Sequence, residues 1–285
     1  MEIERVNNLS AEDFHARFLA AERPVVIEGA FDAWPARRLW SPDYFKTRYG
    51  DLKVQAEILV GDAPATGTAV SVEGRGKLTR LPGNRRPFRQ QEITLREYFE
   101  RVEGSTADRQ WFVSLQPITR QCPALEQDIG PLGFYRPWQQ RAVFHEPLLW
   151  IAPAGTVSRL HFDRLPNLVT QFWGHKKWLI FPRAQWEQLY LPSSLAIKQF
   201  SPLDVTAPDL ARYPKFADAT PIELTLRAGE TLFIPTDWPH HVTTESFSIS
   251  MNFWWVTWRE ARRLPAIWLR RLGAMVRGQA AGYGG

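Results

Sequence analysis

The stretch "LLWIAPAGTVSRLHFDRLPNLVTQFWGHKKWLIFP", residues 148–182, decides the fold of this chain. It consists of short runs of β-branched and aromatic residues separated by turns that contain Gly or Pro, and such runs indicate strands. Residues 221–244 and 246–258 have the same character. Short strands that follow one another at this spacing predict an antiparallel barrel or sandwich.

The chain before residue 148 has a different character. Apolar residues at helical spacing predict short helices at 9–20 and 94–102. Residues 25–27 predict a buried strand, and residues 61–91, which are rich in Gly, Pro and basic side chains, predict a long loop or a hairpin. We expect these elements to be α/β additions to the barrel that follows them.

The domain boundaries follow from these patterns. We expect a single domain over residues 1–258, with helical and strand additions at 1–147 and the barrel core at 148–258. A basic amphipathic C-terminal helix and tail are expected at 259–285. The predicted fold class is therefore mainly β, with helices added at both ends of the chain.

The net charge of +5 is a property of the tail alone. Residues 259–285 contain six arginines and one acid, whereas the 258 residues before them contain 29 basic and 29 acidic residues. A neutral body argues against a nucleic-acid partner. We expect the tail helix to pair with its copy in a homodimer or to cover the barrel. A third alternative is that it lies on an anionic membrane surface.

The cysteine count and the hydropathy pattern bear on the cell compartment. Cys122 is the only cysteine, so the chain cannot form an internal disulfide, which fits a reducing compartment. The first 18 residues contain neither the basic nor the apolar region of a secretory signal. The sequence contains no run of about 18 apolar residues, which a transmembrane helix would need. We expect a cytoplasmic protein.

His161 and Asp163 stand at the head of a stretch that otherwise predicts a buried strand. Residues i and i+2 of a strand lie on the same face, so an imidazole and a carboxylate would project together. A surface turn in which Asp163 bonds its own backbone is the alternative. The pair alone is weak evidence, because about 0.6 His-x-acid pairs are expected by chance in a chain of this composition.

A histidine pair, His240 and His241, follows the apolar run 231–235 and supplies a third metal ligand. Two His and one carboxylate are the ligands of non-haem Fe(II) oxygenases, which keep open positions, whereas Zn(II) sites more often use three His or two His and Glu. Neighbouring residues of a strand face opposite sides. Only one histidine of the pair can reach the pocket, and the spacing alone does not select it.

Two blocks of the sequence resemble the JmjC/cupin-like oxygenases, in particular the group related to the factor-inhibiting-HIF asparaginyl hydroxylase. Residues 148–182 resemble the family pattern of His-x-Asp, then Asn, Gln, Gly and Lys at fixed steps, and a Phe-Pro end. Residues 226–255 resemble its Gly-Glu, apolar strand, Ile-Pro, Trp, His and closing Asn-Phe-Trp. The resemblance implies a double-stranded β-helix that binds Fe(II) and 2-oxoglutarate and uses O2.

The resemblance also implies roles for individual residues. His161, Asp163 and His240 match the metal ligands, and these three are thereby the expected catalytic residues. His241 matches a companion that does not bind the metal. Four further residues match positions around the co-substrate, namely Lys176, Ser158, Asn167 and Asn252.

Among these four, Lys176 matches the residue that pairs with the distal carboxylate of 2-oxoglutarate. Ser158 matches a hydroxyl that hydrogen-bonds the same carboxylate, and Asn167 and Asn252 match polar residues that line the site. A buried dicarboxylate does need a cation with charge-assisted hydrogen bonds. From alternation alone, either Lys176 or Lys177 faces inward and the other faces water.

One departure from the family pattern concerns a Tyr hydroxyl that relatives place against the co-substrate. The corresponding strand is "QWFVSLQ", residues 110–116, and carries Trp111 or Phe112 at the matching position. Neither side chain acts as a Tyr hydroxyl does. Ser114 and Gln116 are the candidate replacements.

The function that the resemblance implies is that of a 2-oxoglutarate-dependent dioxygenase. It would hydroxylate a C–H bond of a protein, peptide or small-molecule substrate and release succinate and CO2. One alternative is a metal-binding cupin that acts on a small molecule without 2-oxoglutarate, for which Lys176 would be dispensable. The other is a non-catalytic interaction module.

Overall fold

The computed structural model describes residues 2–60, 88–103, 109–130, 133–134, 147–191, 198–257 and 259–260. The strands are β1 Glu4–Asn7, β2 Val25–Glu28, β3 Lys53–Val60, β4 Phe88–Thr94, β5 Arg109–Gln116, β6 Leu148–Ala152, β7 Val157–Asp163, β8 Asn167–Trp173, β9 His175–Ile180, β10 Lys198–Phe200, β11 Ile222–Arg227, β12 Glu230–Ile234, β13 His240–Thr244 and β14 Ser248–Trp254. The helices are α1 Ala11–Asp13, α2 Ala36–Leu39, α3 Pro42–Arg48, α4 Leu95–Glu103 and α5 Ile118–Gln121, with shorter or irregular turns η1 Phe14–Leu19, η2 Pro123–Asp128, η4 Arg183–Gln185 and η5 Pro214–Asp218.

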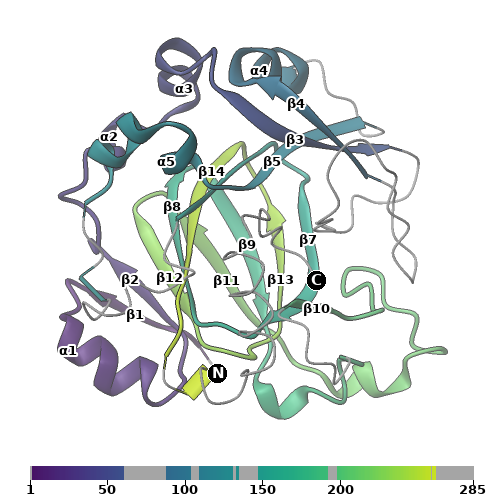
Figure 1. The fold of residues 1–285 in the computed structure, drawn as a ribbon. Helices are drawn as coiled ribbons and strands as arrows, with labels where there is room; N and C mark the ends of the chain where they lie inside the picture. The colour runs from purple at the N-terminus through teal and green to yellow at the C-terminus, as the bar shows by residue number, and fades with distance from the viewer. Residues whose placement is uncertain are drawn as a thin grey trace, which may run out of the picture.

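Two sheets form the barrel (Figure 1). The larger sheet has nine strands in the order β1-β2-β12-β8-β14-β6-β5-β3-β4, and the smaller sheet has five in the order β10-β7-β13-β9-β11. Of the eight core strands, β6, β8, β12 and β14 lie in the larger sheet and β7, β9, β11 and β13 lie in the smaller one, as in a double-stranded β-helix, and this confirms the predicted fold class. The remaining strands extend the larger sheet at both ends and the smaller sheet at one end.

Three apolar clusters hold the layers together. One cluster lies between the sheets and includes Val169, Trp178 and Leu232. A second joins the outer face of the larger sheet to the N-terminal helices, for example through Phe14, whose ring centroid is 4.9 Å from that of Phe233. The third cluster covers the outer face of β7 with residues of the segment after β9. The barrel strands β7, β8, β9, β13 and β14 also carry buried polar side chains.

The N-terminal additions follow the sequence pattern with two differences. Helix α4 and strand β2 are present where they were expected. The helix predicted over 9–20 begins as α1 but continues as the π-helical η1, which buries Phe14 and Phe18 together. Residues 88–91, expected in the loop or hairpin at 61–91, belong to β4, which pairs antiparallel with β3; residues 61–87 lie outside the described residues.

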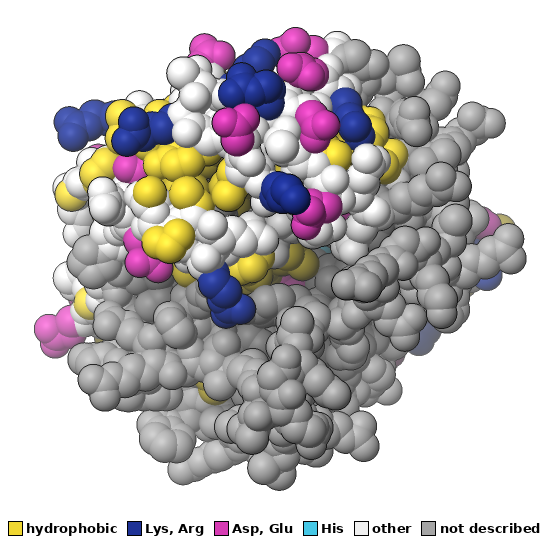
Figure 2. All heavy atoms as spheres, turned by 45° about the horizontal axis from the view of Figure 1, so that its top comes forward, with side chains coloured by type: hydrophobic (Ala, Val, Ile, Leu, Met, Phe, Trp, Pro, Cys, Tyr) yellow, Lys and Arg dark blue, Asp and Glu magenta, His cyan; other side chains and the backbone are white. Residues whose placement is uncertain are grey.

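The face that carries α3, α4, β3 and β4 has mixed charge. Figure 2 shows Lys and Arg interspersed with Asp and Glu on it, beside a group of apolar side chains. Lys46 of α3 pairs with Glu103 of α4 at 3.2 Å, and Lys53 of β3 pairs with Glu92 of β4 at 3.2 Å. Exposed ion pairs of this kind are typical of a solvated protein surface and contribute little to stability.

Residues 259–260 begin a helix, and the rest of the predicted tail helix, with the homodimer proposed for it, lies outside the described residues. Every helix of the described part is too short or too polar to cross a lipid bilayer.

Gly174 makes the tight turn between β8 and β9, and its substitution tests this part of the fold. Its φ is +68°, and an added Cβ would collide with the carbonyl oxygen of Phe247. We expect Gly174→Ala to lower the free energy of unfolding by about 2 kcal/mol or more, because strain and collision add together. Urea denaturation measures this change as a lower midpoint with the same m value.

The matched control is Gly133→Ala, because an added Cβ at Gly133 meets nothing within 4 Å. It should change the free energy of unfolding by less than about 0.5 kcal/mol. Equal midpoints for both variants would show that the β8–β9 turn does not have the described conformation.

Candidate metal centre and co-substrate site

His161, Asp163 and His240 come together inside the barrel. His161 and Asp163 lie at the end of β7, and His240 lies at the start of β13, directly opposite His161 in the antiparallel register. One possible ligand atom from each of the three side chains lies within 4.8 Å of the other two, and the two imidazole centroids are 4.2 Å apart. All three residues are buried, so their lone pairs converge where water is scarce.

Backbone carbonyls fix the orientation of both imidazoles. Nδ1 of His161 lies 2.5 Å from the carbonyl oxygen of Arg159, and Nδ1 of His240 lies 2.9 Å from that of Trp238. A carbonyl oxygen can only accept, so each Nδ1 carries the proton and each Nε2 presents its lone pair, as in metal-bound histidines generally. Asp163 is held in turn by the Trp254 indole, whose Nε1 donates to Oδ2 at 3.2 Å.

The structure separates His240 from His241. His241 points to the outer face of β13, and its Nε2 lies 3.4 Å from the Thr243 hydroxyl. Burial lowers the pKa of His241 to about 4, so it stays neutral near pH 7. The choice that the spacing left open therefore falls on His240 for the interior cluster.

The donor set fits a divalent metal ion. Two imidazoles and one carboxylate from two neighbouring strands can occupy one side of an ion and leave its other positions open. This is the set used by non-haem Fe(II) oxygenases, whereas structural Zn(II) sites are closed by four protein ligands. The cluster therefore suits a metal that must also bind small molecules.

A buried lysine marks a second polar place in the interior. Lys176 of β9 donates from Nζ to the Ser250 hydroxyl at 2.7 Å, and its neighbours across the strands are Leu226 and Thr244. Burial lowers the pKa of Lys176 to about 7. Among the described residues no carboxylate pairs with it, so the site has the electrostatic character of an anion-binding pocket.

The exposure of Lys177 shows which of the two adjacent lysines faces the solvent. Its side chain is 41% exposed and lies 2.8 Å from Glu223 on the neighbouring strand. That pair is a surface ion pair of small energetic value. Lys176, which is buried, is therefore the inward-facing member.

The other predicted co-substrate residues lie on the barrel strands. Ser158 is on β7 opposite Val242 of β13. Asn252 of β14 and Asn167 of β8 contact each other, with the Asn252 amide donating to the Asn167 side-chain oxygen at 3.3 Å. Both asparagines are buried, so their side-chain amides form a polar contact inside the barrel.

The strand β5 shows what replaces the expected Tyr. Trp111 packs in the outer cluster and is not on the interior face. Phe112 lies on the interior face opposite Glu57 and has no polar atom. Ser114 donates to Glu57, and Gln116 donates to the Ser114 carbonyl oxygen at 2.7 Å, so both candidate replacements are engaged within β3 and β5.

Two residues that the sequence analysis did not identify lie beside Lys176. Ser250 of β14 receives the Lys176 hydrogen bond, and Trp150 of β6 lies opposite Ser250. Both lie on strands whose alternating pattern could have placed them on the interior face. That Trp150 and Ser250 lie next to each other could not be known without the pairing of β6 with β14.

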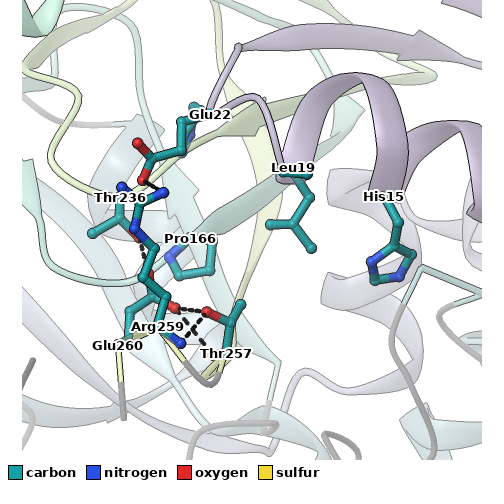
Figure 3. A pocket seen from close by; sticks show the side chains of 10 residues that line it. His15, Leu19, Glu22, Pro166, Thr236, Thr257, Arg259 and Glu260 are labelled. Carbon is teal, nitrogen blue, oxygen red and sulfur yellow. Dashed lines mark hydrogen bonds and ion pairs between the residues drawn. The ribbon is translucent and has the colours of Figure 1, made fainter. Parts of the chain in front are cut away.

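A separate cavity of about 380 Å³ lies between residues that follow β1 and residues at the start of the C-terminal segment (Figure 3). None of the three clustered residues lines it, and its lining consists of His15, Leu19, Ala20, Glu22, Pro166, Pro235, Thr236, Thr257, Arg259 and Glu260. Glu260 accepts hydrogen bonds there from the Thr236 hydroxyl at 2.9 Å and from the Thr257 amide at 3.1 Å. Because these polar groups already satisfy each other, the cavity adds no chemistry to the cluster.

Comparison with known proteins agrees with the geometry. Residues 11–260 match the sequence profile of the cupin-like domain. The chain belongs to the cupin-like domain family. The chain is 28% identical over 246 residues to lysine-specific demethylase 8 of Xenopus tropicalis, a match that covers 86% of this chain and 51% of that protein. The chain thus spans about half the length of that relative.

Two human relatives are covered more fully. The chain is 28% identical over 269 residues to the bifunctional peptidase and (3S)-lysyl hydroxylase JMJD7, with 85% of this chain and 80% of that protein covered. It is 26% identical over 262 residues to the tRNA wybutosine-synthesizing protein 5, with 89% and 77% covered. The predicted JmjC/cupin-like family is confirmed, and so is the prediction that the family is one of oxygenase enzymes.

The histidine pair allows a matched test of the candidate metal centre. We expect Mn(II), used in place of oxidisable Fe(II), to raise the Tm of the unaltered protein by about 5 °C or more at saturating concentration. His240→Gln should abolish this shift, because it removes one of the three converging lone pairs.

His241→Gln is the control, and it should keep the shift because His241 lies on the outer face. The measurement is a thermal-shift titration of all three proteins with the metal. Loss of the shift in His241→Gln with its retention in His240→Gln would contradict the assignment.

Proposed function

We propose that this cupin-like protein is an Fe(II)- and 2-oxoglutarate-dependent oxygenase. It hydroxylates a C–H bond of a protein, peptide or small-molecule substrate and releases succinate and CO2. The observation that carries the proposal is the presence, inside one barrel, of a buried two-histidine, one-carboxylate cluster and a buried lysine that lacks a carboxylate partner among the described residues. The first suits a metal with open positions, and the second suits the far end of a dicarboxylate.

His161, Asp163 and His240 would hold Fe(II) through two Nε2 atoms and one carboxylate oxygen. The bound metal would supply the site for the keto-acid end of 2-oxoglutarate and for O2. Lys176 and Ser158 would bind the distal carboxylate, and the amides of Asn167 and Asn252 would line the pocket. Burial of the cluster and of the lysine excludes water, which strengthens these interactions and limits side reactions.

The electrostatics of Lys176 support a dianionic ligand. A lysine surrounded by Trp150, Ser250, Leu226 and Thr244 has lost its hydration without gaining a counter-charge. A carboxylate placed against it would restore the charged form and raise its pKa from about 7. A cupin that does not use 2-oxoglutarate would have no need for this arrangement, and neither would an interaction module.

The names of the relatives and the charges on the surface bear on the substrate class. The names of two relatives specify lysine or lysyl groups, and the name of a third specifies tRNA. The described surface of this chain carries interspersed charges of both signs on the face of α3 and α4 (Figure 2). We therefore favour a protein, peptide or small molecule over a nucleic acid, and we place the protein in the cytoplasm because its one cysteine, Cys122, is unpaired.

The two adjacent lysines allow a matched test of the activity. With Fe(II), 2-oxoglutarate, O2 and ascorbate as the reductant, the unaltered protein should form succinate slowly even without substrate, and NMR measures the succinate. Lys176→Ala should raise the KM for 2-oxoglutarate by roughly 100-fold, because it removes a charge-assisted hydrogen bond from a buried site.

Lys177→Ala is the control and should leave this KM unchanged. Succinate formation that Lys176→Ala does not affect would favour another binding mode for the co-substrate. Absence of succinate together with metal binding would favour the cupin without 2-oxoglutarate, and absence of both would favour the interaction module.

The lowered pKa of Lys176 predicts a pH-dependent affinity. Binding of the dianion requires the protonated lysine, and the fraction protonated falls as the pH rises above about 7. The Kd for 2-oxoglutarate should therefore rise by up to about tenfold for each pH unit above 7, measured by calorimetry with Mn(II) in the absence of O2.

Lys176→Arg is the control, because an arginine stays protonated throughout this range. Its Kd should depend on pH much less steeply, whatever its value at pH 7. An equally steep dependence in Lys176→Arg would assign the pH effect to another group.

A further inference from the structure

Trp150 lies beside the buried lysine on the interior face of the larger sheet. It stands in the middle of β6, directly opposite Ser250 of β14, and directly paired residues of neighbouring strands share a face. The Ser250 hydroxyl is the group that receives the Lys176 hydrogen bond. Nζ of Lys176 lies 5.9 Å from the centroid of the Trp150 ring, so the indole forms one wall of the place where the ammonium sits.

The indole N–H of Trp150 is buried without an acceptor. The residue is 8% exposed, and no hydrogen-bond acceptor for Nε1 is found in the described part of the chain. A buried N–H without a partner costs free energy. The Trp178 Nε1 likewise has no acceptor in the described part, and Trp150 differs from it in lying beside the buried Lys176 ammonium. Trp150 therefore points to an acceptor that is supplied from outside the chain.

Two donors, the Lys176 ammonium and the Trp150 indole N–H, define the chemistry of that acceptor. Lys176 contributes a cation whose hydrogen-bond partner is a neutral hydroxyl, and Trp150 contributes a neutral N–H donor. Phe112, on the same face of the next strand, has no donor to offer. A carboxylate has two oxygens and can accept from both groups at once.

We propose that the Trp150 indole N–H donates a hydrogen bond to the distal carboxylate of 2-oxoglutarate, next to the Lys176 ammonium. Trp150 is then a binding residue that selects a keto acid with a second carboxylate over one without it. This assignment rests on the proposed function, because it requires 2-oxoglutarate to be the ligand. It adds a donor that the sequence pattern did not indicate.

Trp150→Phe tests the assignment, because it keeps an aromatic ring against Lys176 and removes the N–H. Binding is measured by calorimetry with Mn(II) in the absence of O2, with 2-oxoglutarate and with 2-oxobutyrate, which has the same keto-acid end and no distal carboxylate. We expect the Kd for 2-oxoglutarate to rise about tenfold, and the affinities for 2-oxobutyrate and Mn(II) to stay unchanged.

Trp111→Phe is the matched control, because Trp111 is a buried Trp on the outer face of the same sheet, and its Kd should not change. An unchanged Kd for 2-oxoglutarate in Trp150→Phe overturns the assignment and leaves the proposed function intact. Equal losses for both keto acids also overturn it, because they would indicate a general disturbance of the pocket. If the unaltered protein does not bind 2-oxoglutarate, the proposed function itself fails.

A second measurement does not depend on the folding of the variant. In the unaltered protein labelled with ¹⁵N-Trp, one of the 13 indole N–H resonances should move downfield and exchange more slowly when 2-oxoglutarate binds with a diamagnetic metal such as Zn(II). 2-Oxobutyrate should not cause this change. Absence of any such resonance overturns the assignment.

Discussion

The antiparallel register of β7 with β13 is the constraint on which the rest of the site depends. It sets His240 opposite His161 and thereby brings together residues that are far apart in the sequence. A shift of one residue would turn His240 outward and His241 inward, because side chains alternate between the two faces of a strand. The pairing of β13 with β9 on its other side, where His240 lies opposite Ile180, fixes that register from both directions.

The interior carries polar groups at the expense of stability. Lys176 has a pKa of about 7 in the folded chain, against a usual value of 10.5. Between these two values the unfolded chain binds a proton that the folded chain does not, so the free energy of unfolding rises with pH across this window. The penalty is fully present below about pH 7, and a fold selected for stability alone would carry an apolar residue at this position.

Much of this arrangement could be predicted from the sequence, because it follows from alternation along single strands. The barrel strands from Leu148 onward and the shared face of His161 and Asp163 are local properties of this kind. Alternation could not choose between His240 and His241 or between Lys176 and Lys177. The family resemblance favoured His240 and Lys176, and the pairing of strands turns these two residues inward. Trp150 was missed because its partner Ser250 is distant in the sequence. The π-helical η1 was missed because helical spacing does not distinguish it from an α-helix.

The hydrogen bond from Thr236 to Glu260 has a practical consequence for anyone who produces this protein. It holds the beginning of the C-terminal segment against the loop between β12 and β13. Thr236, the donor in that loop, lies four residues before His240. A version of the chain cut short before Glu260 would lose this fastening and loosen the loop that positions one histidine of the cluster. The boundary of any shortened version is therefore best set beyond residue 260.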